Sequence, residues 1–328
     1  MTSPKLDVVA IGDAIVDVIA ATTETFLESN GLRKGSMRLL SPLEADTLYD
    51  AMGPARETSG GSAANSMAGA AALGLSAAFM GQTADDQLGA IFAHDLRSLG
   101  VRFDTPPLPR GLPTGRCLIL VTPDAQRTMN TCPGASHELT PEALDFDLIA
   151  SASVTFLEGY LWGPENPRRA MLKAAEAARS AGRTVAFTLS ESLCIAGRRE
   201  GVLGMIESRV IDLLFGNEDE LLQLTGAPGL DAALAILAPK VETIVATRGA
   251  AGAIAASADT RIEIVAAPVE RVVDTTGAGD LFASGFLAAR CRGRPLDLCL
   301  QTGALAAAEI ISHFGARPEA DLRERVQL

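Results

Sequence analysis

Short apolar segments of strand length alternate along this chain with longer stretches that are rich in Ala and Leu. The segment Ile-Asp-Leu-Leu-Phe at 211–215 is mostly apolar, as a strand buried on both faces of a sheet must be. The alternation predicts βαβ units and a mostly parallel sheet with helices on both faces. We predict strands at 6–11, 77–80, 153–157, 184–189, 211–215, 242–246 and 262–265, and helices at 63–73, 86–99, 166–181, 231–238, 278–291 and 296–312.

Residues 15–40 and 101–131 interrupt this alternation, because no long amphipathic helix follows their β-like segments at once. These segments could pair as a small separate sheet, which would suggest a lid over a cleft. They could also be edge hairpins of the main sheet. We expect one chain of 1–328 in which 15–40 and 101–131 form the lid, and a large α/β domain takes up about 1–14, 41–100 and 132–328.

Composition excludes several classes of partner. The formal net charge of -12 argues against a nucleic acid, because phosphate backbones are bound by basic patches. No run of about 18 apolar residues is present, so no membrane span is expected, and no targeting signal is recognised. The cysteines form no CxxC pair, which suits packing roles in a reducing cytoplasm. They stand at positions 117, 132, 194, 291 and 299.

The segment from Val272 to Phe282 carries the most chemical information. It reads Val-Val-Asp-Thr-Thr-Gly-Ala-Gly-Asp-Leu-Phe, so strand-forming residues lead into small residues and then into an apolar helix. Gly277, Ala278 and Gly279 let the backbone turn sharply and approach a ligand closely. Their N–H groups lie where the helix starts, with the helix dipole behind them. This arrangement predicts an anion site suited to a transferring phosphoryl group.

Asp280 directly follows these small residues. Its carboxylate could accept a proton from a substrate hydroxyl while the adjacent amides stabilise the phosphoryl oxygens. The alternative is an ordinary helix start with a stabilising Asp in its first turn. The segment is not a Walker A loop, because no Lys follows the glycines. It is not a dinucleotide-binding GxGxxG either, because Phe282 stands at the third glycine position.

Three segments resemble signatures of one known family. Residues 274–280 (Asp-Thr-Thr-Gly-Ala-Gly-Asp) resemble the C-terminal signature of the ribokinase/PfkB family of carbohydrate and nucleoside kinases. Residues 60–65 (Gly-Gly-Ser-Ala-Ala-Asn) resemble its N-terminal signature, and 217–220 (Asn-Glu-Asp-Glu) resemble its N-x-x-E element. The resemblance implies an α/β, ribokinase-like three-layer sandwich with a central mostly parallel sheet and a small β-sheet lid. It also implies an ATP-dependent phosphotransferase with an alcohol acceptor.

By this resemblance, Asp280 is the catalytic base and 277–279 form the anion hole. Asn217 and Glu220 are expected to act on Mg²⁺ through water, since Mg²⁺ prefers oxygen ligands and keeps several waters. The alternative for Glu220 is an exposed helix carboxylate. Some members bind a monovalent cation such as K⁺ near Asp274 and Thr276. The residues expected to contact ATP or its phosphates are Asn217, Glu220, Thr247, Gly249, Gly252, Arg127 and Thr276.

Two of these ATP contacts have plainer alternatives. Arg127 resembles an arginine that reaches the phosphoryl group from the lid, and otherwise would be an exposed lid residue. Residues 247–252 (Thr-Arg-Gly-Ala-Ala-Gly) resemble the family's nucleotide-side loop, and otherwise would be a tight turn between two strands.

The expected substrate contacts come from the N-terminal part of the chain. Asp17 matches the family's substrate-hydroxyl aspartate, and a carboxylate can accept from two hydroxyls at once. Gly60 and Gly61 would let the backbone approach the sugar, and Asn65 would bind its hydroxyls. The alternative for this segment is a capped helix start with a solvated Asn65. Asp13 stands where related kinases often have Asn, and we include it as a candidate contact.

Within the family, the chain resembles adenosine kinases more closely than ribokinases, in residues 211–218 and 188–190 and at Tyr160. Tyr160 falls where adenosine kinases place an aromatic residue that stacks on the purine, a contact worth roughly 1–3 kcal/mol per base. It could instead pack on the core. Met37 and Cys117 are candidate residues of the base pocket.

The sequence leaves several functions open. The first is phosphorylation of the 5′-hydroxyl of a purine nucleoside, adenosine above all, in nucleoside salvage. The second is a sugar kinase acting on ribose, fructose or 2-keto-3-deoxygluconate, with Arg116 or Arg127 binding a sugar acid. A non-catalytic nucleoside-binding protein and a dehydrogenase are the remaining classes; an intact Asp280 weighs against the former and the missing GxGxxG against the latter. A monomer and a homodimer both remain open.

Overall fold

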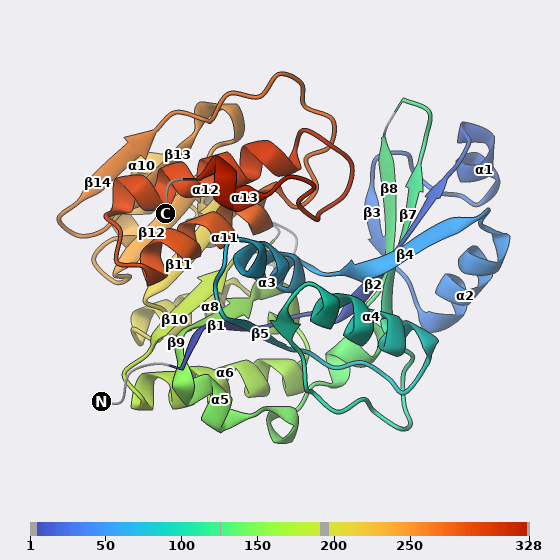
Figure 1. Cartoon of the computed structure of the whole chain (residues 1–328), viewed down its shortest axis with the longest axis horizontal. Helices are drawn as coiled ribbons and strands as arrows, with labels where there is room; N and C mark the ends of the chain where they lie inside the picture. Colours follow the sequence, from blue (N-terminus) through green and yellow to red (C-terminus); the bar gives the residue numbers. More distant parts are fainter. Residues whose placement is uncertain (1–4, 125, 191–196, 327–328) are drawn as a thin grey trace.

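The computed structural model describes residues 5–124, 126–190 and 197–326, which form a large and a small β-sheet (Figure 1). The large sheet is nine-stranded and parallel, except for the antiparallel pairs β12–β13 and β13–β14. Its strands run in the order β14 (Arg261–Ile264), β13 (Ala253–Ala256), β12 (Thr243–Thr247), β11 (Leu213–Asn217), β10 (Thr184–Thr188), β9 (Ala152–Glu158), β1 (Leu6–Ile11), β5 (Ala77–Met80) and β6 (Val101–Arg102).

Helices cover both faces of this sheet, because the strands alternate apolar side chains between two buried cores. Val8 and Ala10 of β1 belong to one core, and Val9 and Ile11 belong to the other. The first face carries α3 (Ser62–Ala72), α4 (Gln87–Ser98), α11 (Ala278–Cys291) and α12 (Leu296–Ile310). The second carries α5 (Phe146–Ser151), α6 (Glu165–Ser180), α8 (Arg199–Glu207), α9 (Glu218–Thr225) and α10 (Leu230–Leu237).

Few aromatic rings contribute to these cores, and three of them gather under α4. Phe79, Phe92 and Phe103 lie with ring centroids 5.2–6.0 Å apart and are all buried. Burying one such ring stabilises the fold by about 1.5–3 kcal/mol. This cluster fixes α4 against β5. At its start, Asp86 caps α4 by accepting from the Gly89 N–H at 2.8 Å.

The small sheet stands beside the large one and is five-stranded (Figure 1). One face packs against α1 (Glu24–Ser29) and α2 (Pro42–Ala51) through residues such as Val18, Leu118 and Leu48. The other face carries Ile15, Ile119 and Met129, among other side chains. The strands run in the order β3 (Met37–Leu39), β8 (Arg127–Cys132), β7 (Gly115–Val121), β2 (Ile15–Ala21) and β4 (Ala55–Gly60).

The predicted fold class is confirmed, and the strand pairing corrects the expected bounds of the small sheet at two points. β4 at 55–60 pairs with β2, although we expected 41–100 to lie in the large domain. β6 at 101–102 pairs with β5 of the large sheet, although we expected 101–131 in the lid. The strands β2 and β3 within 15–40, and β7 and β8 within 101–131, therefore form a separate sheet with β4 rather than edge hairpins of the large sheet.

The remaining described elements are short. α13 (Leu322–Arg325) follows α12, and the described residues also form the 3₁₀ helices η1 (Gly134–Glu138), η2 (Pro141–Ala143), η3 (Gly159–Trp162) and η4 (Gly249–Ala251). Among the described residues, no helix is both long and apolar enough to cross a membrane. Cysteines 117, 132, 291 and 299 are free thiols, and Cys194 lies outside the described residues.

Candidate active site

A cleft of about 510 Å³ lies between the open face of the small sheet and the segment that follows α12. The small sheet contributes Asp17 and Arg127, and α3 contributes Asn65. The described residues that line it are Asp17, Ile19, Ala21, Thr22, Arg56, Thr58, Ser59, Asn65, Val121, Thr122, Pro123, Arg127, Thr276, Phe314, Gly315, Ala316, Arg317, Pro318 and Glu319.

Asp280 lies in the first turn of α11, and two residues of α3 hold its carboxylate. Ser62 Oγ donates to Asp280 Oδ1 at 2.6 Å, and Asn65 Nδ2 donates to Oδ2 at 3.0 Å. Burial raises the pKa of Asp280, and these two hydrogen bonds together with Arg317 oppose that rise. The alternative for this segment, a helix start capped by Ser62, is not found: Gly61 is the N-cap of α3, and the Ser62 hydroxyl donates to Asp280.

The small residues before Asp280 form the start of α11, as predicted. Gly277 is the N-cap with φ +78°, a conformation that favours glycine, and a Cβ there would come within 2.9 Å of Ala316. The N–H of Ala278 donates to Thr275 O at 3.2 Å. Gly279 is exposed, and a Cβ built on it would meet no atom within 4 Å. The open approach to this helix start is therefore at Gly279, where an anion would find the positive end of the dipole.

Asp17 reaches the cleft from β2 and lies against the glycines that begin the 60–65 motif. A Cβ on Gly60 would come within 2.4 Å of the Asp17 carboxyl carbon, and a Cβ on Gly61 would come within 2.3 Å of Asp13 O. Gly61 also has φ +88°. The absence of a side chain at both glycines thus lets the Asp17 carboxyl and the Asp13 carbonyl lie close to this backbone. Burial raises the pKa of Asp17 to about 6, although Arg317 and Arg127 lower it.

Asp13 is buried and, unlike Asp17, is not among the residues that line the cleft. Its backbone N–H donates to Glu158 Oε2 at 3.2 Å, and the N–H of Ala63 donates to the same oxygen at 3.0 Å. Burial raises the pKa of Asp13 to about 6 and that of Glu158 well above its usual value. The Glu158 carboxylate therefore connects the backbone at Asp13 to the first turn of α3 in the interior of the protein.

Asn217 and Glu220 form a capping box at the start of α9. Asn217 Oδ1 accepts from the Glu220 N–H at 2.8 Å, while Glu220 accepts from the Asn217 N–H at 2.9 Å and from Nδ2 at 2.8 Å. Glu220 is buried, not an exposed helix carboxylate. Because both of its oxygens already accept hydrogen bonds, the pair fits contact with Mg²⁺ through water better than direct ligation. Among the described residues, no three His, Cys, Asp or Glu side chains gather as a metal site.

The 247–252 loop begins beside this capping box. Thr247 ends β12 and is the register partner of Asn217 at the end of β11. The loop makes a tight turn into antiparallel β13, with Gly249 at φ +54° and Gly252 at φ +90°. A Cβ on Gly252 would come within 2.0 Å of Ile264 O, so backbone packing alone requires glycine there. The turn also lies at the carboxyl edge of the sheet, where α/β folds bind ligands.

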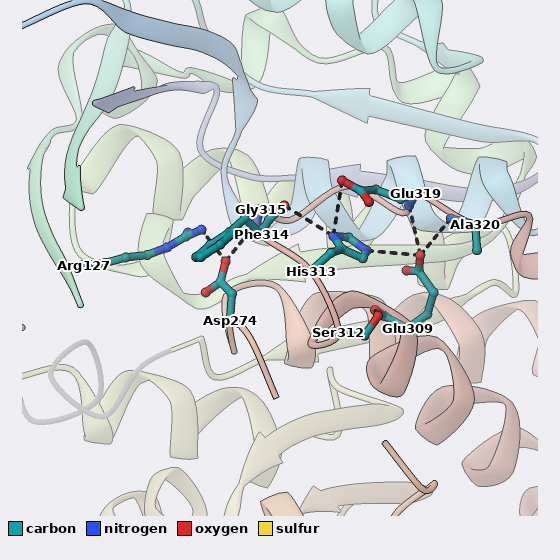
Figure 2. Close-up of polar contacts among 9 residues, drawn as sticks. All are labelled: Arg127, Asp274, Glu309, Ser312, His313, Phe314, Gly315, Glu319 and Ala320. Atoms are coloured by element: carbon teal, nitrogen blue, oxygen red, sulfur yellow. Dashed lines mark hydrogen bonds and ion pairs between the residues drawn. The ribbon is translucent and has the colours of Figure 1, made fainter. Parts of the chain in front are cut away.

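Arg127 crosses from β8 to the loop before α11 (Figure 2). Its guanidinium contacts the Asp274 carboxylate and donates to Thr276 Oγ1 at 3.0 Å. Asp274 also accepts from the N–H groups of Thr276 at 3.0 Å and Gly315 at 2.9 Å. Arg127 is therefore not an exposed residue. The residues present do not fit a monovalent cation against Asp274, because the guanidinium already supplies a positive charge there.

The segment that follows α12 forms one wall of the cleft, and a buried carboxylate anchors it (Figure 2). Glu309 Oε1 accepts from the N–H groups of Glu319 at 3.0 Å and Ala320 at 2.9 Å, and contacts His313 Nε2 at 3.1 Å. This wall carries Arg317, which the sequence reasoning missed. No local signal marks Arg317, because its partners lie far away in the chain.

Two of the candidate base-pocket residues, Met37 and Cys117, lie in the small sheet, whereas Tyr160 follows β9 of the large sheet. Asp17 and Cys117 are register partners, as are Met37 and Met129, but Met37 and Cys117 are not among the cleft residues. Tyr160 is half-buried in η3, next to a core Trp162, and its carbonyl accepts from Arg198 Nη1 at 3.3 Å. The structure does not bring Tyr160 together with Asp17 among the cleft residues.

A three-layer α/β body, a small sheet over a cleft and an acidic side chain at a helix start define the class of ribokinase-like small-molecule kinases. The model described as pfkB family carbohydrate kinase matches residues 5–322. The chain belongs to this family and is an ATP-dependent phosphotransferase. Kinases of this family in general use ATP and Mg²⁺. Its structural relatives place its acceptor among nucleosides or sugars.

Three relatives illustrate this range. The adenosine kinase from Sinorhizobium meliloti is 45% identical, with a TM-score of 0.91 and coverage of 98% of each chain. The probable sugar kinase from Rhizobium etli CFN 42 is 42% identical, with a TM-score of 0.92 and coverage of 98% of this chain and 97% of that one. The 5-dehydro-2-deoxygluconokinase from Shouchella clausii is 28% identical over 94% of this chain and 90% of its own.

Proposed function

We propose that this chain transfers the γ-phosphoryl group of ATP to the 5′-hydroxyl of adenosine and so makes AMP in purine nucleoside salvage. The observation that carries the proposal is the carboxylate of Asp280. It is held by Ser62 and Asn65 at the start of α11, beside a cleft to which Asp17 contributes from the facing sheet. Similarity to the S. meliloti adenosine kinase supports the choice of nucleoside.

In the proposed reaction, Asp280 acts as the general base. Its two hydrogen bonds fix the carboxylate in one orientation, so a hydroxyl placed beside it can lose its proton as the new P–O bond forms. The N-terminal amides of α11 near Gly279 would stabilise charge on the transferring group. Asn217 and Glu220 would hold the Mg²⁺ of ATP through water, and the ion would supply neutralisation of phosphate charge there.

Asp17 would hold the ribose, because one carboxylate can accept from two neighbouring hydroxyls. The purine would lie over the apolar part of the small sheet, where Ile19, Ile119 and Met129 share one face. Closure of the small sheet over the bound nucleoside would expel water and limit hydrolysis of ATP. Tyr160 stays a candidate for stacking on the base after such a closure.

A sugar kinase is the second candidate function. Among the possible sugars, the positive charges in the cleft favour a sugar acid. Arg127 and Arg317 both line the cleft, so a substrate carboxylate would find a cation there. Arg116, which we also considered, is directed to the other face of the sheet. It contacts Asp46 and lies over the ring of Tyr49, both in α2.

The test is a phosphorylation screen of the purified protein with ATP and Mg²⁺. Adenosine, inosine, guanosine, ribose, fructose, 2-keto-3-deoxygluconate and 5-dehydro-2-deoxygluconate are compared, and Asp280→Asn is run beside the wild type. Fast turnover of adenosine that the variant loses is the expected result. Turnover of a bare sugar or sugar acid without nucleoside activity would replace adenosine as the substrate and leave Asp280 in its role.

A further inference from the structure

Arg317 makes contacts that tie three parts of the cleft together. It lies in the wall segment after α12, and its Nη2 donates to Ser59 O and to Ser59 Oγ, both at 2.7 Å. Its Nη1 donates to Asn65 Oδ1. Ser59 lies in β4 of the small sheet and Asn65 in α3. One guanidinium therefore joins the wall, the small sheet and the helix that supports Asp280.

The contact with Asn65 fixes which way its amide points. A guanidinium has only donors, so it selects the Oδ1 end of the amide. The Nδ2 end is then directed to Asp280 Oδ2, at 3.0 Å. The opposite orientation would place an amide oxygen against a carboxylate and an amide nitrogen against a guanidinium, and both contacts are repulsive. The chain Arg317–Asn65–Asp280 thus has a single satisfied arrangement.

The charge of Arg317 also acts on the protonation of Asp280. The charged groups that act on this site are Arg317, Asp17 and Glu158, with Arg127 acting on Asp17. Burial raises the pKa of Asp280, the hydrogen bonds from Ser62 and Asn65 oppose the rise, and the charge of Arg317 opposes it further. Asp95 helps to hold Arg317 in place, because Ser59 Oγ accepts from Arg317 and donates to Asp95 Oδ2 at 2.5 Å.

We propose that Arg317 is a positioning residue: it orients the Asn65 amide onto Asp280 and keeps Asp280 in the carboxylate form that accepts the substrate proton. This inference rests on the proposed role of Asp280 as the base. It requires no contact between Arg317 and the substrate.

The test is the pH dependence of kcat at saturating substrate, which reports groups of the enzyme–substrate complex. We compare the wild type with Arg317→Met, Asn65→Ala and the double variant. Arg317→Met should lower kcat by about 10–100-fold near pH 7, since hydrogen bonds to charged groups are at stake. It should also shift the acidic limb of the profile to higher pH. If Arg317 acts through Asn65, the losses in kcat should not add in the double variant.

Arg323→Met is the matched control, because Arg323 lies in the same C-terminal region and donates to a backbone carbonyl, Ala72 O, at 3.0 Å. It should leave the profile unchanged. Arg317→Lys keeps the charge but cannot reproduce the fork to Asn65 and Ser59. It should lower kcat with the limb near its wild-type position, and it serves if Arg317→Met does not fold.

The outcomes separate this inference from the proposed function. An acidic limb at the wild-type pH in Arg317→Met, or additive losses with Asn65→Ala, would overturn the role of Arg317 while Asp280→Asn is still inactive. If Asp280→Asn retains its turnover, the proposed base is wrong and the role of Arg317 is overturned with it.

Discussion

Arg127 and Asp274 form an ion pair across the cleft, with 10% and 6% of their side chains exposed. Arg127 belongs to the small sheet and Asp274 to the loop before α11, so the pair connects the two parts of the molecule at the site itself. A charge buried to this extent is costly unless it is paired. The ion pair therefore fixes the small sheet relative to the large domain at the place where the reaction is proposed to occur.

Removing one member of this pair should be strongly destabilising. Arg127→Met leaves the Asp274 charge buried without its cation, and we expect a loss of about 3–5 kcal/mol in the free energy of unfolding. Arg127→Met combined with Asp274→Asn should recover much of this loss. Arg261→Met is the control, since its partner Asp231 is 84% exposed, and it should cost less than about 1 kcal/mol. Urea denaturation of the four proteins measures these differences, and equal losses in Arg127→Met and Arg261→Met would contradict the expectation.

The same pair predicts independence from monovalent cations. Because the Arg127 guanidinium already lies on Asp274, turnover should not change when choline replaces potassium in the assay. In Arg127→Met the carboxylate loses this partner, and potassium should then stimulate the enzyme. Steady-state rates at constant ionic strength decide the point. A wild-type enzyme that stops in choline and recovers in potassium would show that Arg127 does not take the place of the cation.

Asp280→Asn should separate binding from chemistry. The amide keeps the size of the side chain but cannot accept the proton, so turnover should fall by about 10²–10⁴-fold while ATP and nucleoside still bind. Calorimetry measures the binding and a coupled assay measures the turnover. Asp259→Asn, in an exposed loop, is the matched control and should have wild-type activity. Near-normal turnover in Asp280→Asn would remove this residue from the mechanism.

Asp17 should make stability depend on pH. Its pKa is raised from 3.8 to about 6 by burial, so the folded protein binds more protons at this site than the unfolded chain between these values. The stabilising contribution of this site is thus present at low pH and is lost as the pH rises through about 6. Asp17→Asn should therefore raise Tm at pH 7.5, and by less at pH 4.5. An equal change in Tm at both values would mean that Asp17 does not titrate in this range.

Gly61 should tolerate alanine less well than a glycine of similar backbone conformation. Gly61 has φ +88° and a Cβ there would come within 2.3 Å of Asp13 O, whereas Gly31 has φ +63° and open space. Gly31→Ala should cost about 1 kcal/mol from backbone strain alone. Gly61→Ala should cost about 1–3 kcal/mol more because of the clash. Chemical denaturation compares the two, and equal costs would mean that the 60–65 loop can shift at little expense.

Sequence patterns predicted the large sheet well because its strands are apolar runs with clear ends. The strands expected at 6–11 and 77–80 are found there, and the one expected at 211–215 lies two residues later. β4 was missed because Ala-Arg-Glu-Thr-Ser-Gly is polar and lies at the edge of the small sheet, where no apolar alternation is required. β13 was missed because its run of Ala and Ile has no period of its own.

The residues of the candidate site likewise divide into those that a sequence pattern predicts and those that it does not. The motif residues Asp280 and Asn65 could be predicted as candidates, because glycines and polar side chains stand together in the sequence, and the structure brings the two into contact. Arg317, Glu309 and the Arg127–Asp274 pair could not be found, because their roles depend on contacts between segments far apart in the chain. A single sequence has no local pattern for such contacts.

The small sheet is connected to the rest of the molecule at four places, between β1 and β2, β4 and α3, β6 and β7, and β8 and η1. A module inserted at one point of a chain can be exchanged for another by a single recombination event. This sheet cannot, because its strands leave and re-enter the large domain repeatedly. New acceptor preferences in such an architecture must therefore arise by replacing individual side chains on the open face of the sheet, one position at a time, while the strands themselves stay in place.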